Sequence, residues 1–215
     1  APFALATSDV GKYALMIEDT TFAEDEAGNP RPITGGTPDY VVRPFGLRLT
    51  ANDNPAAANA AGPDYRVAAT DFDVTVAGVV YDSADDDGDE NGTADDGIPD
   101  GHTDADASAE ADLSDNAVTP SFGQEDTNET AEVTSALVAP SGGASPPLDG
   151  EPVTFTDFAG DADGDGAATQ PTSWPEVGII ELAATVTNYL GSGRSLEGRS
   201  GEVGRFIPAD FKQTA

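Results

Sequence analysis

Three aspartates alternate with small residues in the acidic segment 161-DADGDG-166. Calcium loops place acids at positions 1, 3 and 5, a glycine at position 6 for a sharp turn, and a backbone carbonyl at position 7. The segment fits this first half, although Thr172 stands where the bidentate glutamate of a full loop belongs. We therefore predict a calcium site, with a solvated acidic turn as the alternative. The predicted ligands are Asp161, Asp163, Asp165 and the carbonyl of Ala167.

A second acidic segment, 87-DGDENGTAD-95, is similar to the calcium-binding spacer repeats of extracellular proteins. Such repeats wrap carboxylate and amide oxygens around ions and need little apolar core. Ile98 replaces the closing glutamate of a full loop. We predict calcium here as well, with a disordered acidic insert as the alternative. The predicted ligands are Asp87, Asp89, Asn91 and Asp95.

The other polar residues do not indicate catalysis. His102 is the only histidine, and the chain has no cysteine, so a zinc site would need carboxylates as its other protein ligands. A Ser-His-Asp triad has no G-x-S-x-G segment to support it. With 40 acids in the chain, a pair of carboxylates does not identify a glycosidase site. We predict that the protein is not an enzyme.

The charge of the chain restricts its partners. Forty acids against nine bases give a net charge of −31, which repels nucleic acids and anionic membrane surfaces. The sequence contains no apolar run of 18 residues that would insert into a membrane. Two origins of the acid stay open: cation-binding loops, or a surface kept hydrated as in proteins from salty habitats.

Short segments with alternating apolar and polar residues predict half-buried β-strands. The clearest are 13–17, 72–76, 130–140 and 153–155. No segment has a clear helical period, and about seven to nine strands follow Pro44, which predicts an all-β, antiparallel, immunoglobulin-like sandwich.

One long acidic loop interrupts this strand pattern. Residues 82–112 contain 13 acids and no lysine or arginine, so they cannot form a core and we predict an inserted loop. Pro44 interrupts an apolar run, and proline cannot donate to a strand ladder, so it marks a boundary. We predict that residues 1–44 are terminal strands of a preceding or packed β module and that 45–215 form the sandwich.

The segment 174–211 organises the predicted sandwich, because it holds the only tryptophan and the longest apolar stretch. The apolar side of its first strand changes parity between Ile179 and Ile180, which predicts a β-bulge. A glycine-rich loop at 191–201 and a returning strand at 202–207 follow. In that strand we expect Arg205 to pair with an acid on a neighbouring strand, such as Glu181.

Four segments resemble blocks from the C-terminal region of MshQ-like proteins. They are, in order along the chain, 41–49, 113–125, 174–191 and 202–211. The most specific is 203-VGRFIP-208, after which Ala209 and Asp210 stand where the family pattern has Asp and His. MshQ-like proteins are associated with mannose-sensitive haemagglutinin pili, the type IV pili of Gram-negative bacteria. The resemblance implies an exported, pilus-associated or adhesin-like β protein and carries over no catalytic residues.

These observations predict a calcium-stabilised structural or adhesive module on the surface of a Gram-negative bacterium, whose partners are other surface or pilus proteins or a second copy. One alternative is a calcium-dependent carbohydrate-binding module, which needs an exposed Trp174 or an open calcium position to contact a glycan. The other is a filament subunit that assembles by strand exchange.

Overall fold

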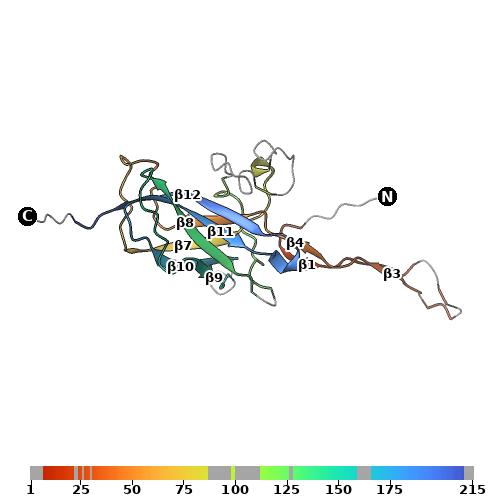
Figure 1. Ribbon diagram of the computed structural model, residues 1–215. Helices are drawn as coiled ribbons and strands as arrows, with labels where there is room; N and C mark the ends of the chain where they lie inside the picture. Colours follow the sequence, from red (N-terminus) through yellow and green to blue (C-terminus); the bar gives the residue numbers. More distant parts are fainter. Residues whose placement is uncertain are drawn as a thin grey trace, which may run out of the picture.

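The protein is nearly all β in the computed structural model, which confirms the predicted all-β sandwich (Figure 1). No helix in the described part of the chain is long and apolar enough to cross a membrane. The residues that the structure describes are 7–21, 24–25, 27–29, 31–86, 98–99, 112–125, 128–158 and 166–210.

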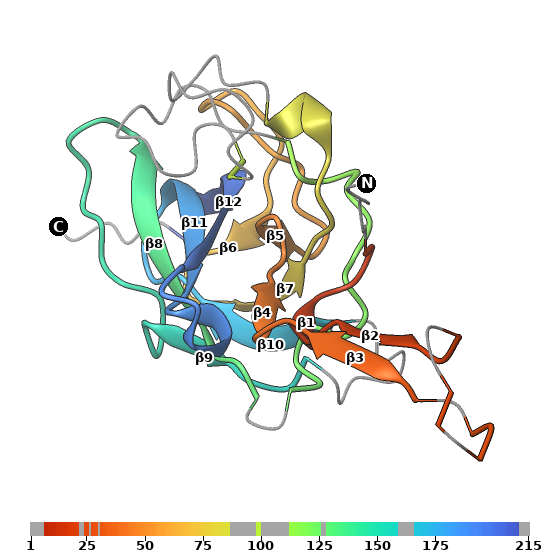
Figure 2. The same cartoon turned by 90° about the vertical axis from the view of Figure 1, so that its right-hand side faces the viewer.

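Two sheets pack face to face around one hydrophobic core (Figure 2). The smaller sheet has the order β10-β7-β5, and the larger has the order β6-β12-β11-β8-β9. All neighbours are antiparallel except β6 and β12, which run parallel. The smaller sheet consists of β5 (Leu47–Ala51), β7 (Asp71–Gly78) and β10 (Ala167–Ser173). The larger sheet consists of β6 (Arg66–Val67), β8 (Ala131–Ala139), β9 (Val153–Phe155), β11 (Gly178–Val186) and β12 (Leu196–Ile207).

The core is built from the inward-facing residues of both sheets. In β7, Phe72, Val74 and Val76 are buried while Asp73 is exposed and Thr75 is half-buried, as the period of a half-buried strand requires. Trp174 lies fully buried against Phe206, with 5.3 Å between the ring centroids. Its indole N–H donates to the carbonyl oxygen of Pro146 at 2.9 Å, so the one polar atom of the ring is satisfied.

The predicted bulge in β11 is confirmed. The ladder between β11 and β8 changes register between Ile179 and Ile180. Both isoleucines are consequently buried, although they are neighbours in sequence. An apolar pattern that changes parity inside a strand therefore marks the position of the extra residue.

The returning strand is longer than predicted, because β12 begins at Leu196, inside the predicted loop 191–201. Gly198 suggested a loop, but it pairs with Ala184 in the ladder with β11. A side chain at this position would overlap the carbonyl oxygen of Leu47 in β5. The glycine is needed because β12 and β5 approach each other closely at this edge of the sandwich.

Strand β10 was not predicted at all. Its sequence, 167-AATQPTS-173, contains a proline and mostly small or polar residues, which favour a turn. Pro171 is tolerated because β10 is an edge strand that pairs only with β7. The missing N–H therefore removes no hydrogen bond to a second neighbouring strand.

The N-terminal residues form two short strand pairs outside the sandwich. β1 (Gly11–Tyr13) pairs with β4 (Tyr40–Val42), and β2 (Met16–Asp19) pairs with β3 (Ile33–Gly36). Val10, just before β1, and Val41 of β4 pack in the sandwich core and anchor the two strand pairs to it. We call residues 16–36 the arm, and it extends away from the sandwich (Figure 1). Pro44 lies between β4 and β5, which belong to different sheets, as the break in the apolar run predicted.

Candidate functional site: an arginine pocket beside the acidic insert

The predicted calcium ligands fall mostly outside the described residues, so the calcium prediction stays a prediction. Ala167 is described, and it is the buried first residue of β10, paired with Ala77 of β7. Among the described residues, no group of three or more His, Asp or Glu side chains could hold a metal ion. The ligands outside the described residues are Asp161, Asp163, Asp165, Asp87, Asp89, Asn91 and Asp95.

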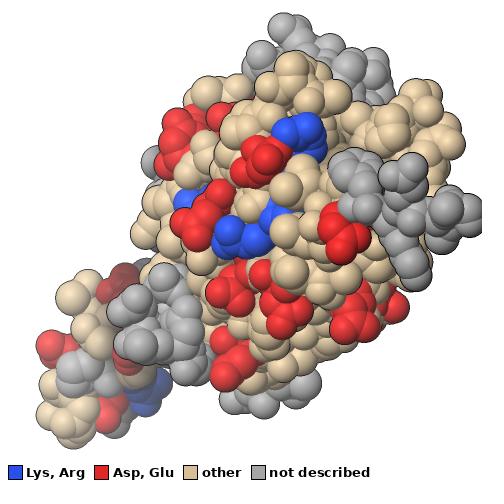
Figure 3. All heavy atoms as spheres, turned by 90° about the vertical axis from the view of Figure 1, so that its left-hand side faces the viewer, with Lys and Arg blue, Asp and Glu red and all other residues tan. Residues whose placement is uncertain are grey.

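Acidic residues spread widely over the face of the molecule in Figure 3, and the few bases lie beside them. Arg66 pairs with Asp53, and Arg205 pairs with Asp64. The expected pair between Arg205 and Glu181 is wrong, since Glu181 pairs instead with Arg199 at 3.2 Å. The ladder explains the difference, because Glu181 lies near the middle of β11, whereas Arg205 lies near the far end of β12.

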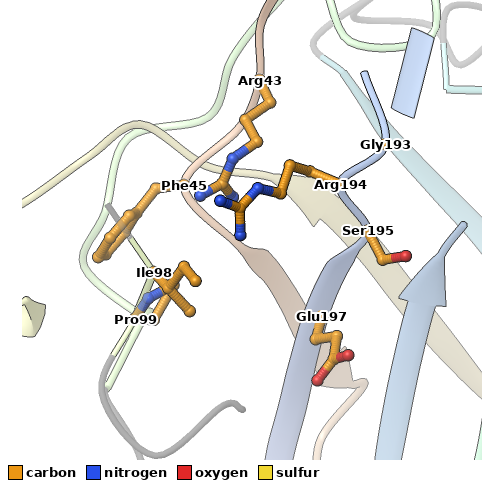
Figure 4. Close-up of a pocket in the computed structure, with 8 residues that line it drawn as sticks. All are labelled: Arg43, Phe45, Ile98, Pro99, Gly193, Arg194, Ser195 and Glu197. Carbon is orange, nitrogen blue, oxygen red and sulfur yellow. The ribbon is translucent and has the colours of Figure 1, made fainter. Parts of the chain in front are cut away.

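Two arginines from distant parts of the sequence converge in one pocket (Figure 4). Arg43 precedes β5, and Arg194 lies in the turn before β12. Figure 4 shows their guanidinium groups pointing into the same space, above Ile98 and Phe45. The cavity has a volume of about 250 Å³, and its remaining lining residues are Pro99, Gly193, Ser195 and Glu197.

The acidic insert supplies part of this pocket. Ile98 and Pro99 come from the insert and line the cavity beside the arginines. Pro99 also packs closely over Gly46, where an added Cβ would lie 3.0 Å from the proline ring. The described piece of the insert is therefore seated at the start of β5.

A neighbouring pocket of about 370 Å³ repeats the arrangement one step along the same strands. Arg48 of β5 and Arg199 of β12 line it together with residues 112–114, at the other end of the insert. Arg48 donates to the carbonyl oxygen of Asn116 at 3.0 Å. Four of the nine bases of the chain thus line the seam between β5 and β12, next to its most acidic segment.

The chemistry that this seam supports is anion binding. A guanidinium offers five N–H donors in a planar fork that matches a carboxylate or a phosphate. Two guanidinium groups facing one cavity repel each other unless an anionic group lies between or beside them. Glu197, which lines the same cavity, has this chemistry, and so do anionic groups of a partner.

Sequence reasoning missed the arginine pocket because its two arginines are far apart in the chain. They meet only because β12 approaches β5 closely at Gly198. One signal was available in the sequence, since Arg43 and Arg48 have the same spacing as Arg194 and Arg199 in a chain with few bases.

A third cavity, of about 570 Å³, lies at the base of the arm and is lined by two glutamates. The hydroxyl of Tyr189 donates to Glu125 at 2.8 Å, and the backbone N–H of Leu190 donates to Glu129 at 2.8 Å. Burial raises the pKa of Glu129, and the charge of Glu125 raises it further. Two carboxylates fall short of the six to eight oxygen ligands that calcium takes, so this pair alone is not a calcium site.

Tyr189 gives a test of this buried contact. Burial, followed by the hydrogen bond to Glu125, raises the pKa of its phenol. Because the pKa of this phenol is higher in the folded chain than in the unfolded chain, protonated Tyr189 stabilises the fold. The stabilisation is complete below the unfolded pKa of about 10 and is lost as the pH rises toward the folded pKa. Tyr189→Phe should therefore cost about 1 kcal/mol at neutral pH through the lost hydrogen bond, and the deficit should shrink above about pH 10.

Urea unfolding at several pH values, followed by circular dichroism, measures the deficit. Tyr65→Phe is a comparison with the same expected trend: burial raises the pKa of Tyr65 to about 12, so its deficit should also shrink above about pH 10, although its hydroxyl donates to the carbonyl oxygen of Asn52 rather than to a carboxylate. A Tyr189→Phe deficit that stays constant from neutral to strongly alkaline pH would contradict the assignment.

Comparison with protein families identifies both halves of the sandwich. The second domain of DUF6701 matches residues 43–171, and the third domain of DUF6701 matches residues 176–215. No curated protein and no solved structure matches the chain. The larger sheet combines both matches, because β6, β8 and β9 come from the first range while β11 and β12 come from the second. Since the second-domain match alone covers more than half of the chain, the protein belongs to the DUF6701 family.

Proposed function

We propose that this chain is a non-catalytic structural module of an extracellular surface protein, of the kind associated with type IV pili or other filaments in Gram-negative bacteria. The observation that supports it best is the larger sheet, in which strands from both family domains share one core. A shared core makes two family domains into one stiff unit, which suits a spacer or presentation module. The four segments that resemble MshQ-like proteins support the link to pili.

Calcium is part of the proposal. Acid-rich loops repel themselves, and ions bound at 87–95 and 161–167 would order them on the sandwich. The arginine seam would hold the ends of the insert while the ions order its middle. The charge spread over the remaining surface would keep the module hydrated.

The glycan-binding alternative loses one of its two possible contacts with a sugar. Trp174 is fully buried and packs in the core, so it offers no stacking surface to a sugar. Only the second possible contact, an open coordination position on calcium, is left for that alternative. We therefore do not put it forward as a second function.

Immunogold labelling tests the surface location. An antiserum raised against the purified chain should label intact cells of the bacterium that encodes it, and also the filaments sheared from those cells. An antiserum against a cytoplasmic protein, used on the same intact cells, controls for lysis. Labelling by the first antiserum only after permeabilisation would overturn the proposal.

A further inference from the structure

The arm is the part of the described chain that most lacks a covering partner. Every residue of β2 and β3 is exposed, and Met16, Ile17 and Ile33 are 73, 52 and 50% exposed. A two-stranded hairpin on its own is marginally stable in water. We propose that a second copy of this chain covers the arm, with β3 of one copy pairing antiparallel to β3 of the other about a twofold axis.

Strand β3 is the edge that is open to such pairing. The sheet edges of the sandwich are short or interrupted, since β6 has two residues, β9 has three and β10 contains Pro171. β5 is covered by β12 at Gly198. β3 carries the sequence Ile-Thr-Gly-Gly, with no charge and no proline to block an incoming strand.

The hydrogen bonds of the arm show which groups of β3 face outward. The N–H of Thr37 donates to the carbonyl oxygen of Leu15 at 2.9 Å, so Thr37 faces β2's side of the hairpin. Backbone groups alternate along an antiparallel strand. Thr34 and Gly36 therefore turn their N–H and C=O groups away from β2, toward the free edge.

Two prolines limit this free edge and select its register. Pro32 and Pro38 occupy the next outward positions on either side, and neither has an N–H to donate. If Thr34 pairs with Gly36 of the second copy, each such pair exchanges two hydrogen bonds and the twofold axis passes Gly35. The same register places Pro32 opposite Pro38, where no donor is missed.

This register also brings opposite charges together. It places Arg31 directly opposite Asp39 of the second copy, and the twofold axis repeats the contact. Arg31 makes no ion pair within the part of the chain that the structure describes, whereas Asp39 pairs with Lys12 at 3.3 Å.

Apolar side chains on one face of the arm would be covered in the same step. Ile17 lies opposite Gly35 in the β2–β3 ladder, and Ile33 shares the face of Gly35. A Cβ on Gly35 would meet no atom within 4 Å, so open space lies over the glycine. In the pair, the isoleucines of both copies would gather over the two glycines at the axis.

The pairing is expected to be weak. Four residues a side bury much less surface than a standard stable interface, and two chains of charge −31 repel each other. Salt screens this repulsion over distances longer than about 10 Å at 0.1 M. Dimers should therefore appear at high protein concentration and moderate salt.

Sedimentation velocity over about a hundredfold range of concentration tests the pairing on the purified chain. Thr34→Pro removes an outward N–H without touching the β2–β3 ladder, and it should lower the association constant at least about tenfold, because two hydrogen bonds of the dimer are lost. Glu18→Pro is the matched control. Glu18 lies opposite Thr34, and its N–H points out of the other edge of the arm, so the dimer should persist.

Charge exchange supplies a second measurement. Arg31→Asp and Asp39→Arg should each weaken the dimer, and the double variant should restore it, because the exchanged pair again faces opposite charges. Circular dichroism and thermal melting check that each variant keeps the sandwich. A wild-type chain that stays monomeric throughout, a dimer that survives Thr34→Pro, or a dimer lost in Glu18→Pro alone would overturn the inference.

Discussion

Trp174→Ala is expected to lower the free energy of unfolding by about 3–5 kcal/mol, a large part of the total stability of an ordinary domain. The ring is fully buried and packs on Phe206, which itself contacts Phe72 and Tyr65. Alanine would leave a cavity in the middle of this aromatic cluster and would leave the carbonyl of Pro146 without its donor. Urea unfolding followed by far-ultraviolet circular dichroism measures the change without depending on tryptophan fluorescence.

Trp174→Phe is the control that separates packing from hydrogen bonding. It keeps an aromatic ring but removes the N–H that Pro146 accepts, so about 1–2 kcal/mol should be lost. Val177→Ala removes a partly exposed side chain nearby, and it should change stability by no more than about 0.5 kcal/mol. A loss below about 1 kcal/mol in Trp174→Ala would mean that the ring does not organise the core.

Calcium in excess should raise the free energy of unfolding of the wild-type chain by about 4 kcal/mol for each micromolar site at a thousandfold excess. The reason is linkage: an ion that binds only the folded chain shifts the equilibrium toward it. Thermal melts with millimolar calcium, with chelator, and with sodium chloride alone measure the effect. Sodium chloride should do much less if the aspartate segments are specific sites, and an equal effect of the two salts would contradict the calcium assignment.

Charge-matched variants localise the calcium effect. Changing Asp161, Asp163 and Asp165 together to asparagine should remove the share of the calcium shift that belongs to that segment. The control replaces three exposed acids elsewhere by their amides, namely Glu132, Asp157 and Glu202. This variant should keep the whole calcium-induced gain in stability. A shift that falls equally in both variants would indicate a general response to net charge.

The elements that could be predicted from the sequence are those whose apolar residues keep a period. Phe72, Val74 and Val76 predicted β7, and the change of parity at Ile179 and Ile180 predicted the bulge in β11. In both strands the apolar pattern in the sequence comes directly from the side chains that are buried.

The elements that could not be predicted depend on contacts between distant residues. Gly198 pairs with Ala184 and must be a glycine because β5 passes beside it, and Pro171 is tolerated because β10 is an edge. The meeting of Arg43 and Arg194 follows from the same approach of β12 to β5. No local window of sequence contains such information.

The position of β11 and β12 in the larger sheet has a consequence for the biosynthesis of the protein. β11 lies in the middle of that sheet, and β12 pairs with β6, which precedes it by about 140 residues, so the larger sheet cannot be completed before β12 has been synthesised. Until then, β6, β8 and β9 lack the two strands that join them, and their apolar inner faces and strand edges stay uncovered.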